Sequence, residues 1–141
     1  LLPIVRQHAG GKAIYFISSN TWTGFPLVTY AEVEWSSRAA SLWLLPGYAR
    51  ARHAGEDSPG LRDIERYTID TVVADLTTMP PAVILLDKRR DKPWYGGIDF
   101  NFIAFFSTDP RFVEIWRNYE PIAVVEEFHI YRRRDDAAAA P

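Results

Sequence analysis

The chain has 141 residues, of which 48% are hydrophobic and 24% are charged, and this balance excludes an intrinsically disordered protein. Sixteen lysines and arginines against eighteen aspartates and glutamates give a net charge of -2, which argues against a dedicated nucleic-acid binder. The absence of cysteine excludes disulfides, thiolate metal sites and cysteine nucleophiles.

The N-terminal segment is expected to contain a helix and then a strand. Residues 1–9 predict a helix that ends at Gly10-Gly11, because glycine readily adopts the left-handed conformation of a helix exit. Residues 12–18, KAIYFIS, form a short apolar run rich in β-forming residues, which indicates a buried strand. A polar loop over residues 19–24 follows this strand.

The next segment gives weaker local signals. Residues 25–31 predict a short helix, because a proline stands where the first helical turn would begin. Alternating apolar residues predict a second strand over residues 33–37. Residues 41–52 carry several leucines, but Pro46 is expected to interrupt any helix there.

The clearest helix is predicted over residues 61–79. Ser58 is placed to cap its N-terminus, and Pro80-Pro81 ends it. One face carries an apolar stripe at helical spacing, formed by Ile64, Ile69, Val72, Val73 and Leu76. Residues 82–86, AVILL, are continuously apolar, which predicts a strand that is covered on both faces.

The remaining sequence predicts a charged loop, two short helices and a hairpin. The loop covers residues 87–97, and the helices lie at residues 101–106 and from Asp109-Pro110 onward. Two short β-forming runs at residues 122–126 and 128–132 are close enough to form a terminal hairpin.

The order of strands and helices predicts an α/β fold, a three-layer Rossmann-like sandwich with a mainly parallel sheet and a C-terminal antiparallel hairpin. Residues 1–134 are expected to form a single domain and residues 135–141 a flexible tail. Because the chain starts at Leu1 without an initiator methionine, we expect it to be an excised segment of a longer protein. Polar residues interrupt its longest uncharged stretch, residues 13–31, so no membrane span is predicted.

The loop after the first predicted strand is one candidate ligand site. Its sequence, SSNTWTG, is not a glycine-rich phosphate loop, but ligands of open α/β sheets gather at the carboxyl ends of strands. We therefore select Ser18, Ser19, Asn20 and Trp22 as candidate ligand-binding residues. The alternative is a solvated turn that holds no ligand.

The loop after the AVILL strand is the second candidate. Its selected residues are Arg89, Arg90, Trp94 and Tyr95, whose cationic and aromatic side chains can hold a phosphate by charge or a sugar by stacking. The same side chains can dock on anionic lipid headgroups beside a membrane. The alternative is a solvated loop in which neighbouring aspartates partly cancel the positive charge.

The sequence contains no recognisable catalytic group. The three histidines, His8, His53 and His129, are scattered, and the G-x-S-x-G motif of serine hydrolases is missing. Glu126 and Glu127 are adjacent on a predicted strand, where neighbouring side chains point to opposite faces. We therefore assign no catalytic residue, no metal site and no cofactor from the sequence.

Three stretches together resemble a known family. They are KAIYFISSNTWTGFPLVTYAEVEWSSR, the PPAVILLD run after the long helix, and the closing WRNYEPIAVVEEFHIYRRR. Their layout, over residues 12–133, resembles the soluble C-terminal region of bacterial polytopic membrane glycosyltransferases of the dolichyl-phosphate-mannose–protein mannosyltransferase-like superfamily. The resemblance implies a small α/β domain outside the cytoplasm, preceded by a bundle of membrane helices with the catalytic acidic residue in an external loop among them. It also implies sugar transfer from a polyprenyl-phosphate donor.

The expected function is therefore that of an extracytoplasmic accessory domain, membrane-anchored through its parent chain and facing the periplasm or the cell exterior. Its expected partners are the transmembrane part of the same polypeptide and a lipid-linked sugar or lipid headgroups, and nucleic acid is not expected. The domain alone would position donor or acceptor without catalysing transfer. One alternative is a self-contained α/β enzyme or binding domain for a phosphorylated or nucleotide-linked small molecule. Another is a carbohydrate-binding or protein-interaction module with exposed aromatic residues.

Overall fold

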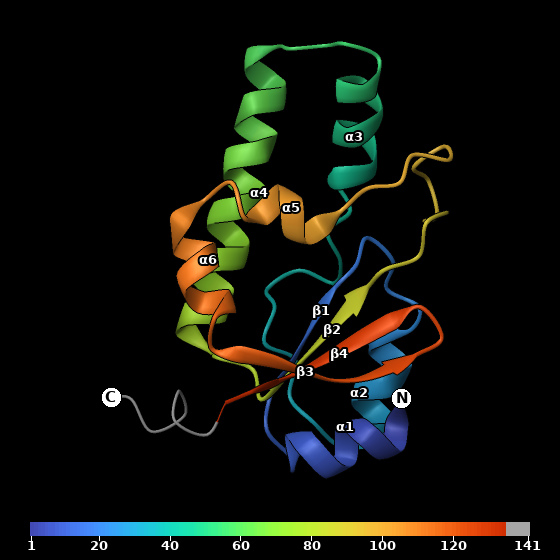
Figure 1. Cartoon of the computed structure of the whole chain (residues 1–141), viewed down its shortest axis with the longest axis vertical. Coiled ribbons are helices and arrows are strands. Elements are labelled where there is room, and N and C mark those ends of the chain that lie inside the picture. The colour runs from blue at the N-terminus through green and yellow to red at the C-terminus, as the bar shows by residue number, and fades with distance from the viewer. Residues whose placement is uncertain (135–141) are drawn as a thin grey trace.

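Four strands form one mixed sheet in the order β1-β2-β4-β3 (Figure 1). The computed structural model describes residues 1–134, and the tail predicted at residues 135–141 lies outside the described residues. The strands are β1 (Ile14–Ile17), β2 (Val83–Asp87), β3 (Tyr119–Val125) and β4 (Phe128–Arg133). β1 and β2 run parallel, whereas β4 is antiparallel to both β2 and β3.

The prediction of a mainly parallel sheet is therefore wrong, although the α/β class and the C-terminal antiparallel hairpin are confirmed. Helical crossovers join β1 to β2 and β2 to β3, but β3 is not the neighbour of β2, because β4 lies between them. The free edge of β2 is taken by β4, the second strand of the hairpin, so two of the three strand pairs are antiparallel. Local sequence signals identified the strands, but the choice of neighbour depends on how the hairpin packs back on the sheet.

Helices pack on both faces of this sheet (Figure 1). On one face lie α1 and α2, whose apolar side chains meet Ile14, Phe16, Val83 and Leu85. On the other face α3 to α6 meet Tyr15, Ile17, Ile84 and Leu86. The helices are α1 (Leu2–Ala9), α2 (Gly24–Ala31), α3 (Leu45–His53), α4 (Pro59–Thr78), α5 (Phe102–Phe106) and α6 (Pro110–Trp116). Alternate residues of β2 thus enter two cores, as its continuous apolar sequence predicts.

Two local predictions in the first half of the chain need correction. The segment at residues 33–37 forms only an isolated bridge from Trp35 to Ile14 instead of a strand. Pro46 does not interrupt a helix, because it stands in the first turn of α3. Backbone N–H groups in a first turn have no acceptor within the helix, so a proline costs no hydrogen bond there. The predicted end of α1 is confirmed, since Gly10 adopts a left-handed conformation with φ of 56°.

α3 and α4 form a helical hairpin that extends beyond the end of the sheet toward which β1 and β2 point (Figure 1). α4 begins where the Ser58 hydroxyl accepts a hydrogen bond from the Leu61 amide at 3.3 Å. Farther along α4, the buried Asp75 carboxylate accepts hydrogen bonds from Arg38 Nε at 2.6 Å and from the Ser37 hydroxyl at 3.2 Å. These contacts tie α4 to the segment that leads into α3.

The aromatic residues divide into a buried and an exposed group. The buried and partly buried group forms a series of contacting rings in the same core as α4, consisting of Tyr95, Phe100, Phe102, Phe105, Phe106, Phe112, Trp116, Tyr119 and Tyr131. Core packing explains this group. It does not explain Trp22, Trp43 and Trp94, which are 77%, 70% and 62% exposed.

Removal of the α4 cap should weaken the helical hairpin. We expect Ser58→Ala to lower the free energy of unfolding by about 1 kcal/mol, because one amide of the first turn loses its acceptor. Urea denaturation measures this change. Ser107→Ala is the control, because Ser107 is exposed and its side chain makes no hydrogen bond within residues 1–134. Equal stability of the two variants would contradict the capping role.

Candidate ligand-binding cleft

A cleft of about 720 Å³ lies between the α3–α4 hairpin and the loops that follow β1 and β2. Ser19 and Thr21 come from the loop after β1, and Trp94 from the loop after β2. Trp43, Tyr48 and Arg50 come from α3 and the residues just before it. The cleft has the size of small-molecule sites and lies at the carboxyl ends of the two parallel strands, where ligands of α/β sheets bind.

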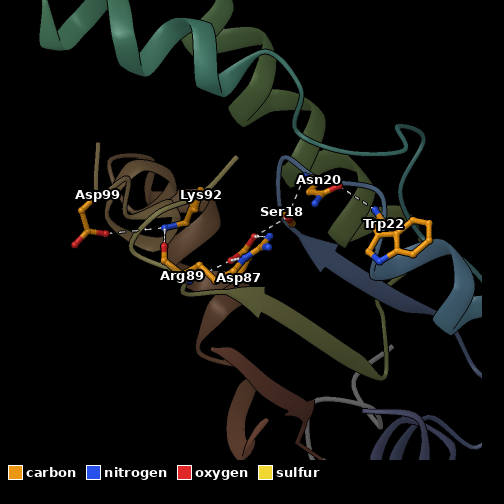
Figure 2. Close-up of polar contacts among 7 residues, drawn as sticks. All are labelled: Ser18, Asn20, Trp22, Asp87, Arg89, Lys92 and Asp99. Atoms are coloured by element: carbon orange, nitrogen blue, oxygen red, sulfur yellow. Dashed lines mark hydrogen bonds and ion pairs between the residues drawn. The ribbon is translucent and has the colours of Figure 1, made fainter. Parts of the chain in front are cut away.

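The floor of this region is held by a buried carboxylate at the end of β2. Asp87 is 1% exposed and accepts a hydrogen bond from the Ser18 hydroxyl at 2.9 Å (Figure 2). Arg89 donates to the same carboxylate through Nη2 at 2.6 Å, through Nε at 3.0 Å and through its backbone amide at 3.1 Å. A buried carboxylate with these donors is fully compensated, so Ser18, Asp87 and Arg89 have a structural role.

The loop after β1 continues from this point by two further hydrogen bonds. The backbone N–H of Asn20 donates to Ser18 Oγ at 3.0 Å, and the backbone N–H of Trp22 donates to Asn20 Oδ1 at 3.0 Å (Figure 2). These bonds fix the turn that places Ser19 and Thr21 against the cleft. The exposed Trp22 indole follows directly but is not among the side chains that line the cleft.

The basic residues after β2 are mostly engaged with the protein. The hydrogen bond to Asp87 raises the pKa of Arg89, whose guanidinium also lies 5.3 Å from the Phe128 ring centre. Lys92 is 3% exposed; its Nζ donates to the Arg89 carbonyl and lies 4.0 Å from Asp99 (Figure 2). Burial lowers the pKa of Lys92. Arg90 is 89% exposed and 3.8 Å from Asp99, outside the cleft.

Two buried hydroxyl groups at the cleft, those of Ser19 and Tyr95, lack hydrogen bonds. Ser19 is 4% exposed and Tyr95 is fully buried, and neither hydroxyl has a partner within residues 1–134. Burial raises the pKa of Tyr95, and the nearby Ser19 hydroxyl lowers it by less, although the geometry of the pair falls short of a hydrogen bond. An unpaired buried hydroxyl costs about 1–3 kcal/mol. A polar ligand group that reaches Ser19 would reduce this cost.

Trp94, which precedes Tyr95, has a strained backbone. Its φ of 69° lies in the left-handed region, which a bulky side chain rarely adopts. Such strain persists where the surrounding structure imposes it, and it is concentrated at functional sites. Here it turns the indole outward into the cleft lining while the next residue, Tyr95, enters the core.

The structure thus separates the eight predicted ligand-binding residues by environment. Ser19 and Trp94 line the cleft, and Tyr95 lies beneath it. The side chains of Ser18, Asn20 and Arg89 are engaged in internal hydrogen bonds, while Trp22 and Arg90 are exposed outside the cleft lining. Sequence reasoning missed the α3 side, Trp43, Tyr48 and Arg50, because these residues stand in a leucine-rich segment that resembles core.

Comparisons with known proteins add no assignment. No protein-family model matches the chain, and neither a curated protein nor a solved structure is significantly similar to it. Within residues 1–134, no three histidine or acidic side chains are grouped so that they could hold a metal ion. None of the helices in this part of the chain combines the length and the apolar character that crossing a bilayer requires.

Loss of the Asp87 charge should destabilise the floor of the cleft. We expect Asp87→Asn to lower the free energy of unfolding by about 2–3 kcal/mol, because Arg89 loses its buried counterion. Asp63→Asn removes an exposed partner of Arg66 and should cost less than about 0.5 kcal/mol. Urea denaturation compares the two variants. If both have the same small effect, the Asp87 carboxylate does not hold the two strand ends together.

Proposed function

We propose that this domain binds the sugar part of a lipid-linked or phosphate-linked ligand in the α3–α4 cleft. The observation that carries the proposal is the pair of exposed indoles, Trp43 and Trp94, that line one cleft from two separate segments. Large aromatic side chains are favoured at positions where they gain contact with a ligand. Because core packing explains neither indole, contact with a ligand accounts best for their exposure.

The cleft chemistry fits a sugar. The flat face of an indole offers apolar surface to the C–H face of a pyranose ring, while sugar hydroxyls need hydrogen-bond partners at the ring edge. Thr21 and Ser41, which carry hydroxyl groups, line the same cleft. A few polar groups on a mostly apolar lining are typical of small-molecule sites. The proposal assigns binding to these residues and no catalytic role to any of them.

In the cell, we propose that this domain is the extracytoplasmic accessory domain of a membrane glycosyltransferase-like protein. The support is the resemblance of its three sequence stretches to that superfamily, together with a cleft suited to a sugar. The transmembrane part of the same polypeptide would be its partner, and a polyprenyl-phosphate sugar or its acceptor its ligand. The Rossmann-like classification belongs to the same proposal and is supported by the parallel β1–β2 pair with helices on both faces.

A nucleotide-linked small molecule is the second candidate ligand. The position of the cleft at the carboxyl ends of β1 and β2 favours it, because nucleotides bind there in many α/β folds. An indole stacks on a base as readily as on a sugar. The two candidates therefore differ in the group that contacts the tryptophans.

Removal of either cleft indole should weaken sugar binding. We expect Trp43→Ala and Trp94→Ala each to reduce affinity about tenfold for a sugar that the wild type binds, because the stacking surface is lost. Isothermal titration with a panel of glucose, mannose, galactose, N-acetylglucosamine and uridine monophosphate measures the change. Trp22→Ala is the matched control, an indole of similar exposure outside the cleft lining.

The panel also separates the candidates. Binding of a monosaccharide with loss in the two cleft variants, but not in Trp22→Ala, supports the sugar proposal. If only uridine monophosphate binds, and its binding is lost in the two cleft variants but not in Trp22→Ala, the nucleotide candidate replaces the sugar proposal. Equal loss in all three variants, or no binding by any member of the panel, overturns the assignment of the cleft.

A further inference from the structure

A second hollow, of about 590 Å³, adjoins the cleft on the other side of Arg50. Arg50 and His53, one turn apart on α3, form one wall. The opposite wall is the loop that follows Trp94 and contains Gly96 and Gly97. Because Arg50 lines both hollows, a ligand seated against the indoles can extend past its guanidinium into the second one.

Within residues 1–134, the charge of Arg50 has no carboxylate partner, and Arg6, which also lacks one, is bonded to the Tyr30 carbonyl. The other arginines of residues 1–134 mostly pair with carboxylates, as Arg52 does with Asp57 at 3.2 Å. The Arg50 side chain is exposed and forms no hydrogen bond or ion pair within the described residues. A guanidinium has five donors arranged to grip a phosphate or carboxylate at two points. An unpaired one between two hollows is therefore available to an anionic ligand.

The loop opposite Arg50 adds backbone donors. Gly96 and Gly97 both have left-handed conformations, with φ of 64° and 79°. Their amides donate no hydrogen bond to another residue of the described chain. A Cβ placed on Gly96 would lie 3.8 Å from Arg50 Cδ, so the arginine stem passes directly over this loop. Free amides of successive residues in such turns are a known means of holding anions.

Neighbouring negative charges do not cancel this site. Asp99 also lines the hollow, but Arg90 at 3.8 Å and Lys92 at 4.0 Å offset its charge. The last carbonyls of α3 would repel an anion if they were free. They are occupied instead, because the carbonyls of residues 50–52 accept hydrogen bonds from the amides of residues 54–56.

We propose that this hollow is a phosphate subsite, and that the ligand of the domain is a glycosyl phosphate whose sugar lies against Trp43 and Trp94 and whose phosphate contacts Arg50. The assignment of the sugar rests on the proposed function, whereas the phosphate subsite stands on Arg50 and its neighbours. A lipid-linked sugar, a free sugar phosphate and a sugar nucleotide all present the same anionic link, and the competitors in the test below distinguish them. In this proposal the phosphate is bound by Arg50 of α3 and not by Arg89 or Arg90.

Three arms of one titration test the subsite. The wild type is titrated with the sugar that binds best in the neutral panel, with the 1-phosphate of that sugar and with inorganic phosphate. We expect the 1-phosphate to bind about tenfold tighter than the neutral sugar, since charge-assisted hydrogen bonds are the strong ones. Arg50→Gln should remove this difference and change the affinity for the neutral sugar less than about twofold. A prenyl phosphosugar and a uridine diphosphosugar, added as competitors, then distinguish the source of the phosphate.

Two further variants serve as controls for the effect of Arg50→Gln. Arg50→Lys keeps the charge but loses the two-point contact and should retain part of the preference for the 1-phosphate. Arg117→Gln removes an exposed arginine just after the C-terminal end of α6, outside the lining of both hollows, and should leave all affinities unchanged. Circular dichroism confirms that each variant is folded.

The outcomes separate the two proposals. Equal affinity for sugar and sugar phosphate in the wild type, or an unchanged preference in Arg50→Gln, overturns the subsite even if neutral sugars bind. Arg50-dependent binding of inorganic phosphate without binding of any sugar supports the subsite and overturns the sugar proposal. No binding in any arm overturns both.

Discussion

The Asp87 carboxylate stands where β2 ends, buried beside the end of β1, and it must be compensated without water. Ser18 and Arg89 provide that compensation from the two loops that begin at this edge. Their hydrogen bonds hold the loops in fixed directions, so that Ser19 from one loop and Trp94 from the other meet in a single cleft lining. The candidate site therefore depends on a polar contact that itself faces no ligand.

The hydrophobic requirements of the sheet explain the other wall of the cleft. β2 is buried on both faces, and α4 covers one of them along with a series of aromatic rings. α4 extends beyond the face of the sheet that it covers, and α3 packs against the part that projects (Figure 1). The hairpin of these helices thus overhangs the carboxyl ends of β1 and β2. The exposed Trp43 and the unpaired Arg50 belong to this overhang, where neither is needed for the core.

Local structure was predictable where a single residue decides it. Ser58 caps α4, Gly10 ends α1, and the apolar run of β2 is covered on both faces, all as the sequence indicates. Strand pairing was not, because β4 competes with other strands for the edge of β2 and no local signal ranks them. Pro46 was misread for a related reason. A proline is equally compatible with the start of a helix and with its interruption, and only the position of α3 distinguishes them.

The site was predictable in its place but not in its residues. The rule that ligands gather at the carboxyl ends of strands selected Ser19, and the cationic and aromatic side chains of the loop after β2 selected Trp94. The same criterion also selected Arg89, whose charge is paired with Asp87 only two residues away. Arg50 carried no sequence signal, because a free arginine and a paired one look alike until the tertiary structure shows which carboxylates are near.

The most direct test of the account is the response of the indole N–H resonances of the five tryptophans to a sugar 1-phosphate. The account predicts that the signals of Trp43 and Trp94 shift together along one binding curve. The signals of Trp22, Trp35 and Trp116, which lie outside the cleft lining, should stay in place. Shifts confined to Trp22, or no shift of any indole while the ligand binds, would contradict the claim that this cleft holds the sugar.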